Sequence, residues 1–462
     1  MKIKSIVIIL TCLSTASFAQ SKSWLLNSKL ALQQIRQTVR SSMMVYLDNP
    51  PTLNQSLNKN YTKAICMAST QPNRRGYLYS LAFYTAGFND PHFHSTTPLF
   101  SNLISPIAIT LKNPGILVSY QHQQYQVSYR NPTQTNLPPI GATLISCDNK
   151  PIEALVQSDI LPFHVQARAH SQATKFSAAI RIFLDGNPFR RYPKQCTFQV
   201  NHHSQQYKIN WHTLSQQQAQ SIPVIKNLLA NPYHFSIMKL KPDGLWLSIP
   251  SLETSAQTNN FFKQLKQLKN LRDHRPIVID LRGNDGGNTT YANQLMKQLF
   301  GKAYFNKIST NSHSVKQIRL SKQNLARLKK NKTVGTEILK KMKQALDKKE
   351  TFFTLAKPHQ PQQNPTHIQS QYHHGLFVIL DHHCFSSCLI FASQLARYPN
   401  TIFIGQPTAS VSHYGEINTI NLTGGATLQY PMAVFEVRTL YFIAQYSLSL
   451  NIAARCKKHN RL

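Results

Sequence analysis

Apolar residues recur every three or four positions in the first part of the chain, residues 20–88. The clearest examples are Leu32, Ile35, Val39 and Met43. This spacing places the side chains on one face of an α-helix, so the region is predicted to be mostly helical. Residues 96–215 change to a period of two, which is typical of short, half-buried strands. The alternation is clearest at Ile116, Val118 and Tyr120, and again at Tyr125, Val127 and Tyr129.

A strand–helix–strand pattern follows in residues 236–301. Apolar runs at Leu245 to Ile249 and at Pro276 to Leu281 predict buried strands, and an amphipathic helix is expected between them. This order and spacing indicate a parallel α/β unit. The pattern resumes after residue 370 with three more elements. These are a strand at Leu376 to Leu380, a helix at Ser387 to Tyr398 and a strand at Thr401 to Ile404.

Residues 302–369 separate the two α/β segments and are interpreted as an insertion. Lys and Arg concentrate in residues 316–349, on a basic amphipathic helical stretch, and a linker rich in Pro, Gln and His follows. Such a helix either contacts anionic surfaces or exposes a solvated face, and the second is commoner. The formal charge of the chain is +34, but its basic residues are dispersed and no nucleic-acid motif occurs. We therefore expect no nucleic-acid partner.

The N-terminus has the pattern of a secretory signal peptide. A basic start is followed by apolar residues from Ile6 to Leu13 and by small residues before Gln20. We expect residues 1–19 to be removed and the protein to be exported, periplasmic or secreted. No later segment has 18 continuous apolar residues, so no integral membrane segment is expected. Six cysteines remain after residue 19; an even number permits disulfides but leaves their pairing open.

Three segments carry residues suited to chemistry. A glycine-rich turn ending in Gly286 and Gly287 follows the strand at Pro276 to Leu281, and its amides could hold a phosphate or an oxyanion. No P-loop and no Rossmann fingerprint accompany it, which disfavours phosphate. Ser386 lies at a strand-to-helix turn, where a serine is either a helix cap or an exposed nucleophile. His92 offers an imidazole that is either a structural side chain or a general base.

Together and in this order, the segments resemble the tail-specific, or C-terminal processing, serine peptidases. The family patterns are I-D-x-R-x-N-x-G-G, an S-A-x-E-I-F-A-like helix start, V-G-x-x-T and D-x-H. They are matched by Ile279 to Gly287, Ser386 to Ala392, Ile404 to Thr408 and Asp90 to His92. The likeness covers about residues 80–95 and 240–430, with a looser similarity of residues 115–215 to a PDZ-like domain. It implies an α/β fold with a crotonase-like (ClpP/crotonase) ββα catalytic core, an N-terminal helical region and a PDZ-like β-rich domain.

The pattern and the resemblance together divide the chain into six parts. These are a signal peptide (1–19), an N-terminal helical region ending in the Asp-Pro-His segment (20–95), a PDZ-like domain (96–215), a catalytic core (236–301 and 370–430), the basic insertion and linker (302–369) and an atypical C-terminal tail (431–462).

The resemblance implies an endopeptidase that hydrolyses peptides or unfolded proteins through an acyl-enzyme on Ser386. The backbone N–H of Ser387, with that of Gly286 or Gly287, would form the oxyanion hole. Ser387 is the alternative nucleophile. No lysine lies between Lys357 and Lys457, which excludes the Ser–Lys dyad of the best-known members. The tricorn-like Ser–His branch is therefore expected, without cofactor or metal.

In that branch His92 is the predicted general base, and His413 is its competitor. His94, His382 and His383 are expected to be surface or structural residues. Glu416 is the candidate for the acid that orients the histidine, because residues 437–462 contain no acidic residue. Replacing a triad acid costs about 10⁴ in rate. The alternative is therefore a catalytically inactive, peptidase-like protein that binds peptides or other ligands.

Overall fold

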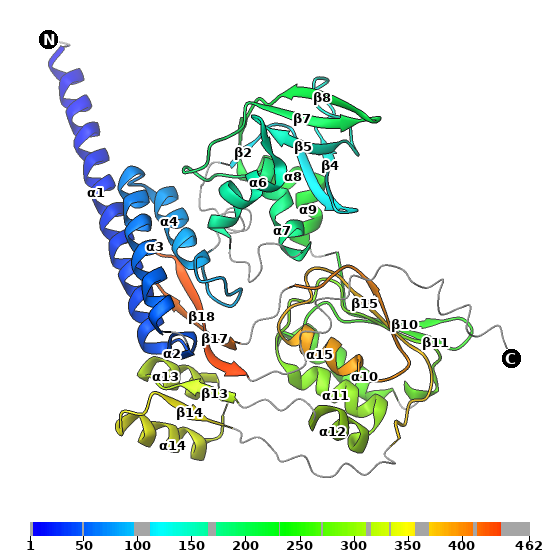
Figure 1. The fold of residues 1–462 in the computed structure, drawn as a ribbon. Helices are drawn as coiled ribbons and strands as arrows, with labels where there is room; N and C mark the ends of the chain where they lie inside the picture. Colours follow the sequence, from blue (N-terminus) through cyan, green and yellow to red (C-terminus); the bar gives the residue numbers. More distant parts are fainter. Residues whose placement is uncertain are drawn as a thin grey trace.

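The computed structural model describes residues 3–48, 50–96, 111–164, 172–230, 232–268, 271–310, 316–331, 334–355, 369–409 and 414–435. Figure 1 shows a group of long helices, a β-rich unit and an α/β unit. Within the described residues, no helix is long and apolar enough to cross a membrane.

The N-terminal part is helical, as its periodicity predicted. Its helices are α1 (Ile3–Ser42), α2 (Val45–Asp48), α3 (Pro50–Thr70) and α4 (Arg74–Ala86). The predicted apolar face of α1 is fully buried in a shared core. Asn73 starts α4 by accepting a hydrogen bond from the Gly76 amide. The chain leaves α4 through the Asp90-Pro91-His92 segment into the short strand β1 (His94–Ser95).

The β-rich unit is a six-stranded sheet packed against helix α7 (Gln172–Phe183). Its strands are β3 (Ile116–Gln121), β4 (Gln124–Arg130), β5 (Thr143–Cys147), β6 (Lys150–Pro151), β7 (Gln195–Val200) and β8 (His203–Lys208). A disulfide between Cys147 and Cys196 joins β5 to β7. Around the sheet lie α6 (Ile152–Leu155), η1 (Val156–Ile160), η2 (Leu161–Phe163), α8 (Gln216–Ser221), α9 (Pro223–Ala230) and the strand pair β2 (Leu111–Asn113) and β9 (His212–Leu214).

The α/β unit contains a five-stranded sheet in the order β10-β11-β12-β15-β16. Its strands are β10 (Ser236–Leu240), β11 (Gly244–Ser248), β12 (Ile277–Asp280), β15 (Leu376–Leu380) and β16 (Thr401–Gly405). Every pair of neighbouring strands is parallel except the antiparallel pair β10–β11, which confirms the predicted parallel unit. Figure 1 shows its helices gathered on one side of the strands. They are α10 (Ala256–Gln267), η3 (Leu271–Asp273), α11 (Thr289–Phe300), α12 (Lys302–Thr310) and α15 (Ser387–Leu395).

A further sheet joins distant parts of the chain. Its central strand β18 (Thr427–Phe435) pairs with β1, with β17 (Tyr414–Asn421) and with β13 (Lys316–Arg319), which pairs with β14 (Phe352–Thr354). The stretch expected to be a helical insertion thus contributes two strands as well as α13 (Lys322–Asn331) and α14 (Thr336–Asp347). Residues 431–435, assigned to the tail, lie in β18; residues 436–462 lie outside the described residues.

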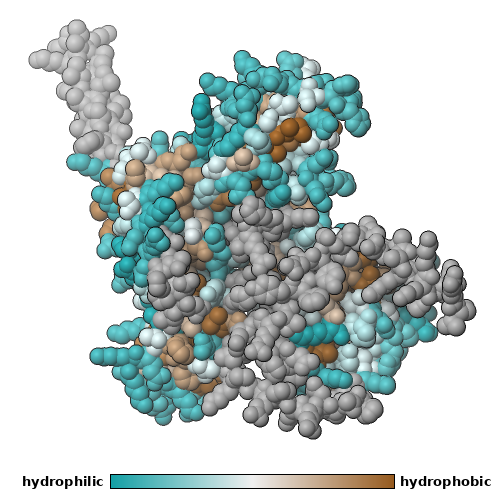
Figure 2. All heavy atoms as spheres, in the orientation of Figure 1, coloured by the Kyte–Doolittle hydropathy of each residue, from teal (hydrophilic) through white to brown (hydrophobic). Residues whose placement is uncertain are grey.

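The helices of this stretch place their apolar faces in the core of the N-terminal helices. Leu328 on α13 and Met342 on α14 are fully buried there. Their lysines lie mainly on the opposite, exposed faces. The face of the molecule in Figure 2 is mostly hydrophilic over the described residues. These contacts favour the solvated-face interpretation of the basic helices.

Candidate active site

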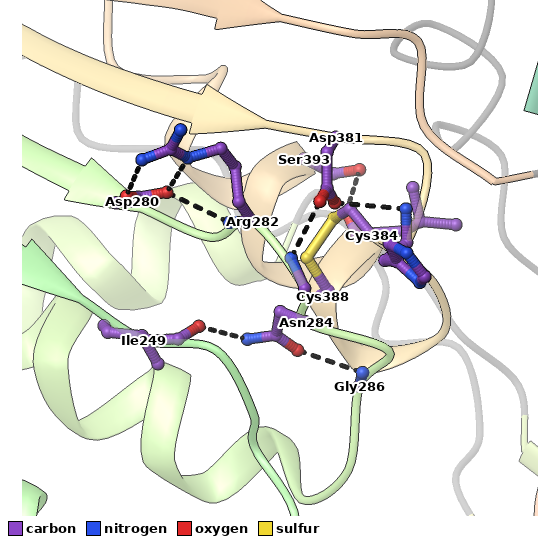
Figure 3. Close-up of a disulfide and its surroundings, with 12 residues drawn as sticks. Ile249, Asp280, Arg282, Asn284, Gly286, Asp381, Cys384, Cys388 and Ser393 are labelled. Carbon is purple, nitrogen blue, oxygen red and sulfur yellow. Dashed lines mark hydrogen bonds and ion pairs between the residues drawn. A yellow bond between two sulfur atoms is a disulfide. The ribbon is translucent and has the colours of Figure 1, made fainter. Parts of the chain in front are cut away.

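The turn after β12 is braced by the polar residues of its own motif. Arg282 donates two hydrogen bonds to the Asp280 carboxylate, at 2.9 and 2.7 Å. The buried Asn284 side chain donates to the Ile249 carbonyl at 2.8 Å and accepts from the Gly286 amide at 2.9 Å (Figure 3). The Gly283 amide donates to Asp381, at the end of the neighbouring strand β15, at 3.0 Å. Parallel pairing of β12 and β15 therefore brings both turns to one edge of the sheet.

Gly286 and Gly287 occupy positions that a side chain could not. Their φ angles are +107° and +130°. A Cβ on Gly286 would lie 2.8–2.9 Å from the Phe385 carbonyl oxygen, the Ser386 Cβ and the Ser387 nitrogen. A Cβ on Gly287 would lie 2.2–2.3 Å from the backbone that follows β11. The glycines therefore let the turn pack directly against the segment that carries Ser386.

The two glycine amides are not equivalent. The Gly286 amide is already committed to the Asn284 side chain. In the part of the chain that the structure describes, neither the Gly287 amide nor the Ser387 amide has a recorded acceptor. These two N–H groups are therefore the ones left to bind an incoming anion. The sequence could not show which of the two glycine amides is free to donate, because only the hydrogen bond to Asn284 distinguishes them.

Ser386 stands at the N-cap position of α15 but does not cap the helix. Its backbone has φ +53° and ψ −120°, and its side chain makes no capping hydrogen bond. By contrast, Asn73, Ser255 and Asn288 have negative φ angles and cap α4, α10 and α11. A missing cap costs about 1 kcal/mol. A residue with a Cβ in such a sparsely populated conformation costs about 1–3 kcal/mol. A strained strand-to-helix turn of this kind directs a serine hydroxyl outward.

Ser387 is engaged in a different way. Its side chain is 6% exposed, and its hydroxyl donates a 2.6 Å hydrogen bond to the Gly287 carbonyl. The bond ties the first turn of α15 to the glycine turn. Of the two neighbouring serines, Ser386 is thus the one whose hydroxyl is not used to hold the structure together.

His92 lies against the residue that precedes Ser386. Its ring centroid is 4.5 Å from that of Phe385, and the residue is 8% exposed. Burial lowers the pKa of His92 to about 4; the nearby His94 lowers it further, and the Tyr414 backbone opposes this effect. Neither ring nitrogen makes a hydrogen bond of normal geometry with a described residue. The fold therefore brings a neutral imidazole beside the turn that carries Ser386.

A carboxylate that was not predicted to have a role, that of Asp90, lies close to this ring. Asp90 accepts a 2.8 Å hydrogen bond from the His92 amide, and the same oxygen lies 3.9 Å from His92 Nδ1. The sequence signal was the Asp-Pro-His spacing itself, since an aspartate readily accepts from an amide two residues later. Glu416 instead makes an ion pair with Lys316 on β13.

The other histidines considered from the sequence lie in different surroundings. His94 lies in β1, with Nδ1 3.3 Å from the Pro91 carbonyl. His382 stacks on Phe176 of α7 at 4.8 Å and bonds Gln406 through Nδ1 at 2.9 Å. His383 is exposed. His413 lies outside the described residues. Across the described ranges, no group of three or more His, Cys, Asp or Glu side chains is placed to hold a metal ion.

Comparison with known proteins identifies the fold. Two crystal structures of mature CPAF match nearly the whole chain. The complex with lactacystin has 14% identity and a TM-score of 0.57, covering 90% of this chain and 92% of that one. The second has 15% identity and a TM-score of 0.56, covering 89% of both. The tricorn protease gives a TM-score of only 0.34 over 32% of its length and supports no argument. No curated protein matches the sequence.

A sequence-family comparison reaches the same conclusion from different information. Residues 245–446 match the model of Peptidase family S41. The match contains the glycine turn, Ser386 and the strands β11, β12, β15 and β16. It confirms the resemblance recognised from the motifs. Over this region the chain is similar to peptidase family S41, the C-terminal processing or tail-specific proteases.

Proposed function

We propose that this protein is a serine endopeptidase that cleaves peptide bonds through an acyl-enzyme on Ser386. The observation that carries the proposal is the backbone of Ser386, which has φ +53° at a helix start that it does not cap. An ordinary capping serine avoids both the loss of the capping hydrogen bond and the backbone strain. A nucleophile gains from them, because the turn exposes its hydroxyl beside unpaired helix amides.

His92 is proposed as the general base that accepts the proton of the Ser386 hydroxyl. Its lowered pKa keeps the imidazole neutral at pH 7, as a base must be. The amides of Ser387 and Gly287 are proposed as the oxyanion hole, since Gly286 already donates to Asn284. A positioned base contributes about 10²–10⁴ in rate, and one oxyanion donor about 10²–10³. As the tetrahedral intermediate collapses to the acyl-enzyme, His92 would give this proton to the leaving amine, and water would then hydrolyse the ester.

Two carboxylates compete for the role of orienting His92. Glu416 is the acid proposed from the sequence, but it would have to leave Lys316 to reach the ring. Asp90 already holds the His92 backbone and lies 3.9 Å from Nδ1. A small rotation of the Asp90 side chain would convert this approach into a hydrogen bond. We therefore favour Asp90.

Export and architecture complete the proposal. The signal-peptide pattern supports a periplasmic or secreted protein, and the disulfides Cys147–Cys196 and Cys384–Cys388 suit an oxidising compartment. The sheet of β3 to β8 with α7 supports a PDZ-like domain, and the sheet of β10, β11, β12, β15 and β16 supports a crotonase-like core. Similarity to a peptidase family supports protein substrates; we propose peptides or unfolded chains.

A fluorophosphonate probe tests the nucleophile directly. The purified protein should be labelled, and Ser386→Ala should abolish labelling. Ser393→Ala is the matched control, because this serine lies on the same helix and donates only to the Leu389 carbonyl. Labelling that survives in Ser386→Ala would refute the assignment. Since mature CPAF was solved in complex with lactacystin, competition by lactacystin is a second readout.

One observation favours a second function, that of a peptidase-like binding protein without turnover. Neither ring nitrogen of His92 makes a hydrogen bond of normal geometry with a described residue, so no such bond joins the base to Ser386. This alternative predicts saturable peptide binding by wild-type protein, no fluorophosphonate labelling and no cleavage products by mass spectrometry.

A further inference from the structure

A disulfide brackets the proposed nucleophile. Cys384 and Cys388 are bonded to each other, with Cα atoms 5.3 Å apart, and both side chains are fully buried (Figure 3). Cys384 belongs to the turn that leaves β15, whereas Cys388 lies in the first turn of α15. Only Phe385, Ser386 and Ser387 lie between them. The bond therefore closes a small ring whose central residue is Ser386.

Both ends of this ring are anchored by the backbone. The Cys384 amide donates to the Asp381 carbonyl, and its carbonyl accepts from the Ala409 amide, each at 3.1 Å. The Cys388 amide donates to the Phe385 carbonyl at 3.0 Å. Between them, Ser386 itself is held by no side-chain cap. The strained residue thus depends on its neighbours for its conformation.

Chain stabilisation does not explain why the crosslink is here. The stabilisation that a disulfide gives by restricting the unfolded chain grows with the length of the closed loop. Cys147 and Cys196 are separated by 49 positions, but Cys384 and Cys388 by only 4. The first disulfide is therefore expected to contribute more to the free energy of unfolding. The second constrains a local turn that is already short.

We propose that the Cys384–Cys388 disulfide is a positioning element for the nucleophile, an inference that rests on the proposed function. It keeps the backbone of Ser386 in its positive-φ conformation and holds the Ser387 amide beside Gly287. Without it, the turn can relax toward an ordinary cap, which withdraws the hydroxyl and misaligns the oxyanion donors. A misplacement of about 1 Å can reduce a rate about 100-fold. Full activity should therefore require the oxidised pair.

The test compares two double variants of the full chain. In Cys384→Ala/Cys388→Ala, the fluorophosphonate labelling rate and kcat should fall at least tenfold, with little change in KM or Tm. In the control Cys147→Ala/Cys196→Ala, Tm should fall, but the labelling rate of the folded protein should stay at the wild-type value. Wild-type labelling of the first variant would overturn the proposal. If wild-type protein is itself not labelled, the proposed function fails instead.

A second measurement avoids dependence on the folding of a variant. Wild-type protein is treated with a small phosphine reductant, and samples are denatured and alkylated to count the free thiols of each pair by mass spectrometry. The labelling rate should fall in proportion to the reduction of Cys384 and Cys388, and it should recover when the pair is reoxidised. Reduction of this pair with an unchanged labelling rate would contradict the inference, whether or not the alanine variant folds.

Discussion

Replacing Gly286 by alanine should lower both the free energy of unfolding and the rate at which Ser386 reacts with a fluorophosphonate. The new Cβ would lie 2.8–2.9 Å from the Phe385 carbonyl oxygen, the Ser386 Cβ and the Ser387 nitrogen, on a backbone with φ +107°. A Cβ on left-handed backbone costs about 1–2 kcal/mol, and forcing atoms into a packed site costs about 1–3 kcal/mol more. The free energy of unfolding should therefore fall by about 2–5 kcal/mol.

The same clash acts on the proposed catalytic groups. The atoms that the new Cβ would meet are backbone atoms and a Cβ, which cannot move away as the end of a flexible side chain could. The turn must shift by a few tenths of an ångström or more, and this displaces the Ser386 hydroxyl and the Ser387 amide. We expect the labelling rate to fall by up to about 100-fold, the loss that a displacement of about 1 Å can cause.

Gly141→Ala provides the matched control. Gly141 has φ +85°, but a Cβ there would meet no atom within 4 Å. This variant should therefore carry the backbone cost without the clash. Urea unfolding followed by fluorescence gives the free energies, and fluorophosphonate labelling under native conditions gives the rates. Equal labelling rates in the two variants would refute the proposed contact between the glycine turn and the nucleophile.

Four further predictions concern His92, Asp90, Glu416 and Asn284. Because burial lowers the pKa of His92 to about 4, its imidazole stays neutral above that pH. The labelling rate should therefore fall only below about pH 5. A pH profile of the labelling rate with its midpoint near 6.5 would contradict this. The same pKa shift should lower the free energy of unfolding as pH falls from 6.5 to 4, because only the unfolded chain binds a proton at His92 in this range. In urea titrations, His92→Gln should make the free energy of unfolding less dependent on pH over the same range. Asp90→Asn should slow labelling more than Glu416→Gln does, and the reverse order would assign the orienting acid to Glu416. Asn284→Ala should lower the free energy of unfolding by about 1–3 kcal/mol, since it leaves the Gly286 amide without its acceptor; equal urea midpoints would disprove this.

The elements that sequence periodicity predicted are those whose pattern is set by local burial. The face containing Leu32 and Ile35 is buried because an amphipathic helix packs its apolar face against the core. The apolar run of β12 is buried throughout, and those of β11 and β15 are buried or partly buried, so a continuous apolar pattern predicts these strands without tertiary information.

The strands β13 and β14 were not predicted, for a physical reason. Lys316–Arg319 has a single apolar residue among charged and polar ones, so it has no period of two. Its strand conformation is imposed by pairing with β18, whose partner residues lie more than 110 positions later in the chain. The pairing of Glu416 with Lys316 depends on the same sheet. Local pattern cannot report a contact that exists only after distant strands meet.

The choice between an enzyme and a binding protein depends on Ser386 more than on the motif that revealed the family. Asp280, Arg282 and Asn284 are explained by the hydrogen bonds with which they brace the glycine turn, and a binding protein would need that turn equally. The conformation of Ser386 has no such explanation. A serine with ordinary N-cap geometry would recover the capping bond and release the backbone strain, together about 2–4 kcal/mol. The chain instead surrounds this serine with a disulfide, an anchored Phe385 and a close-packed glycine, all of which hold it away from the more stable arrangement. Such a cost is expected where the hydroxyl must be presented for reaction, and this is why we favour catalysis.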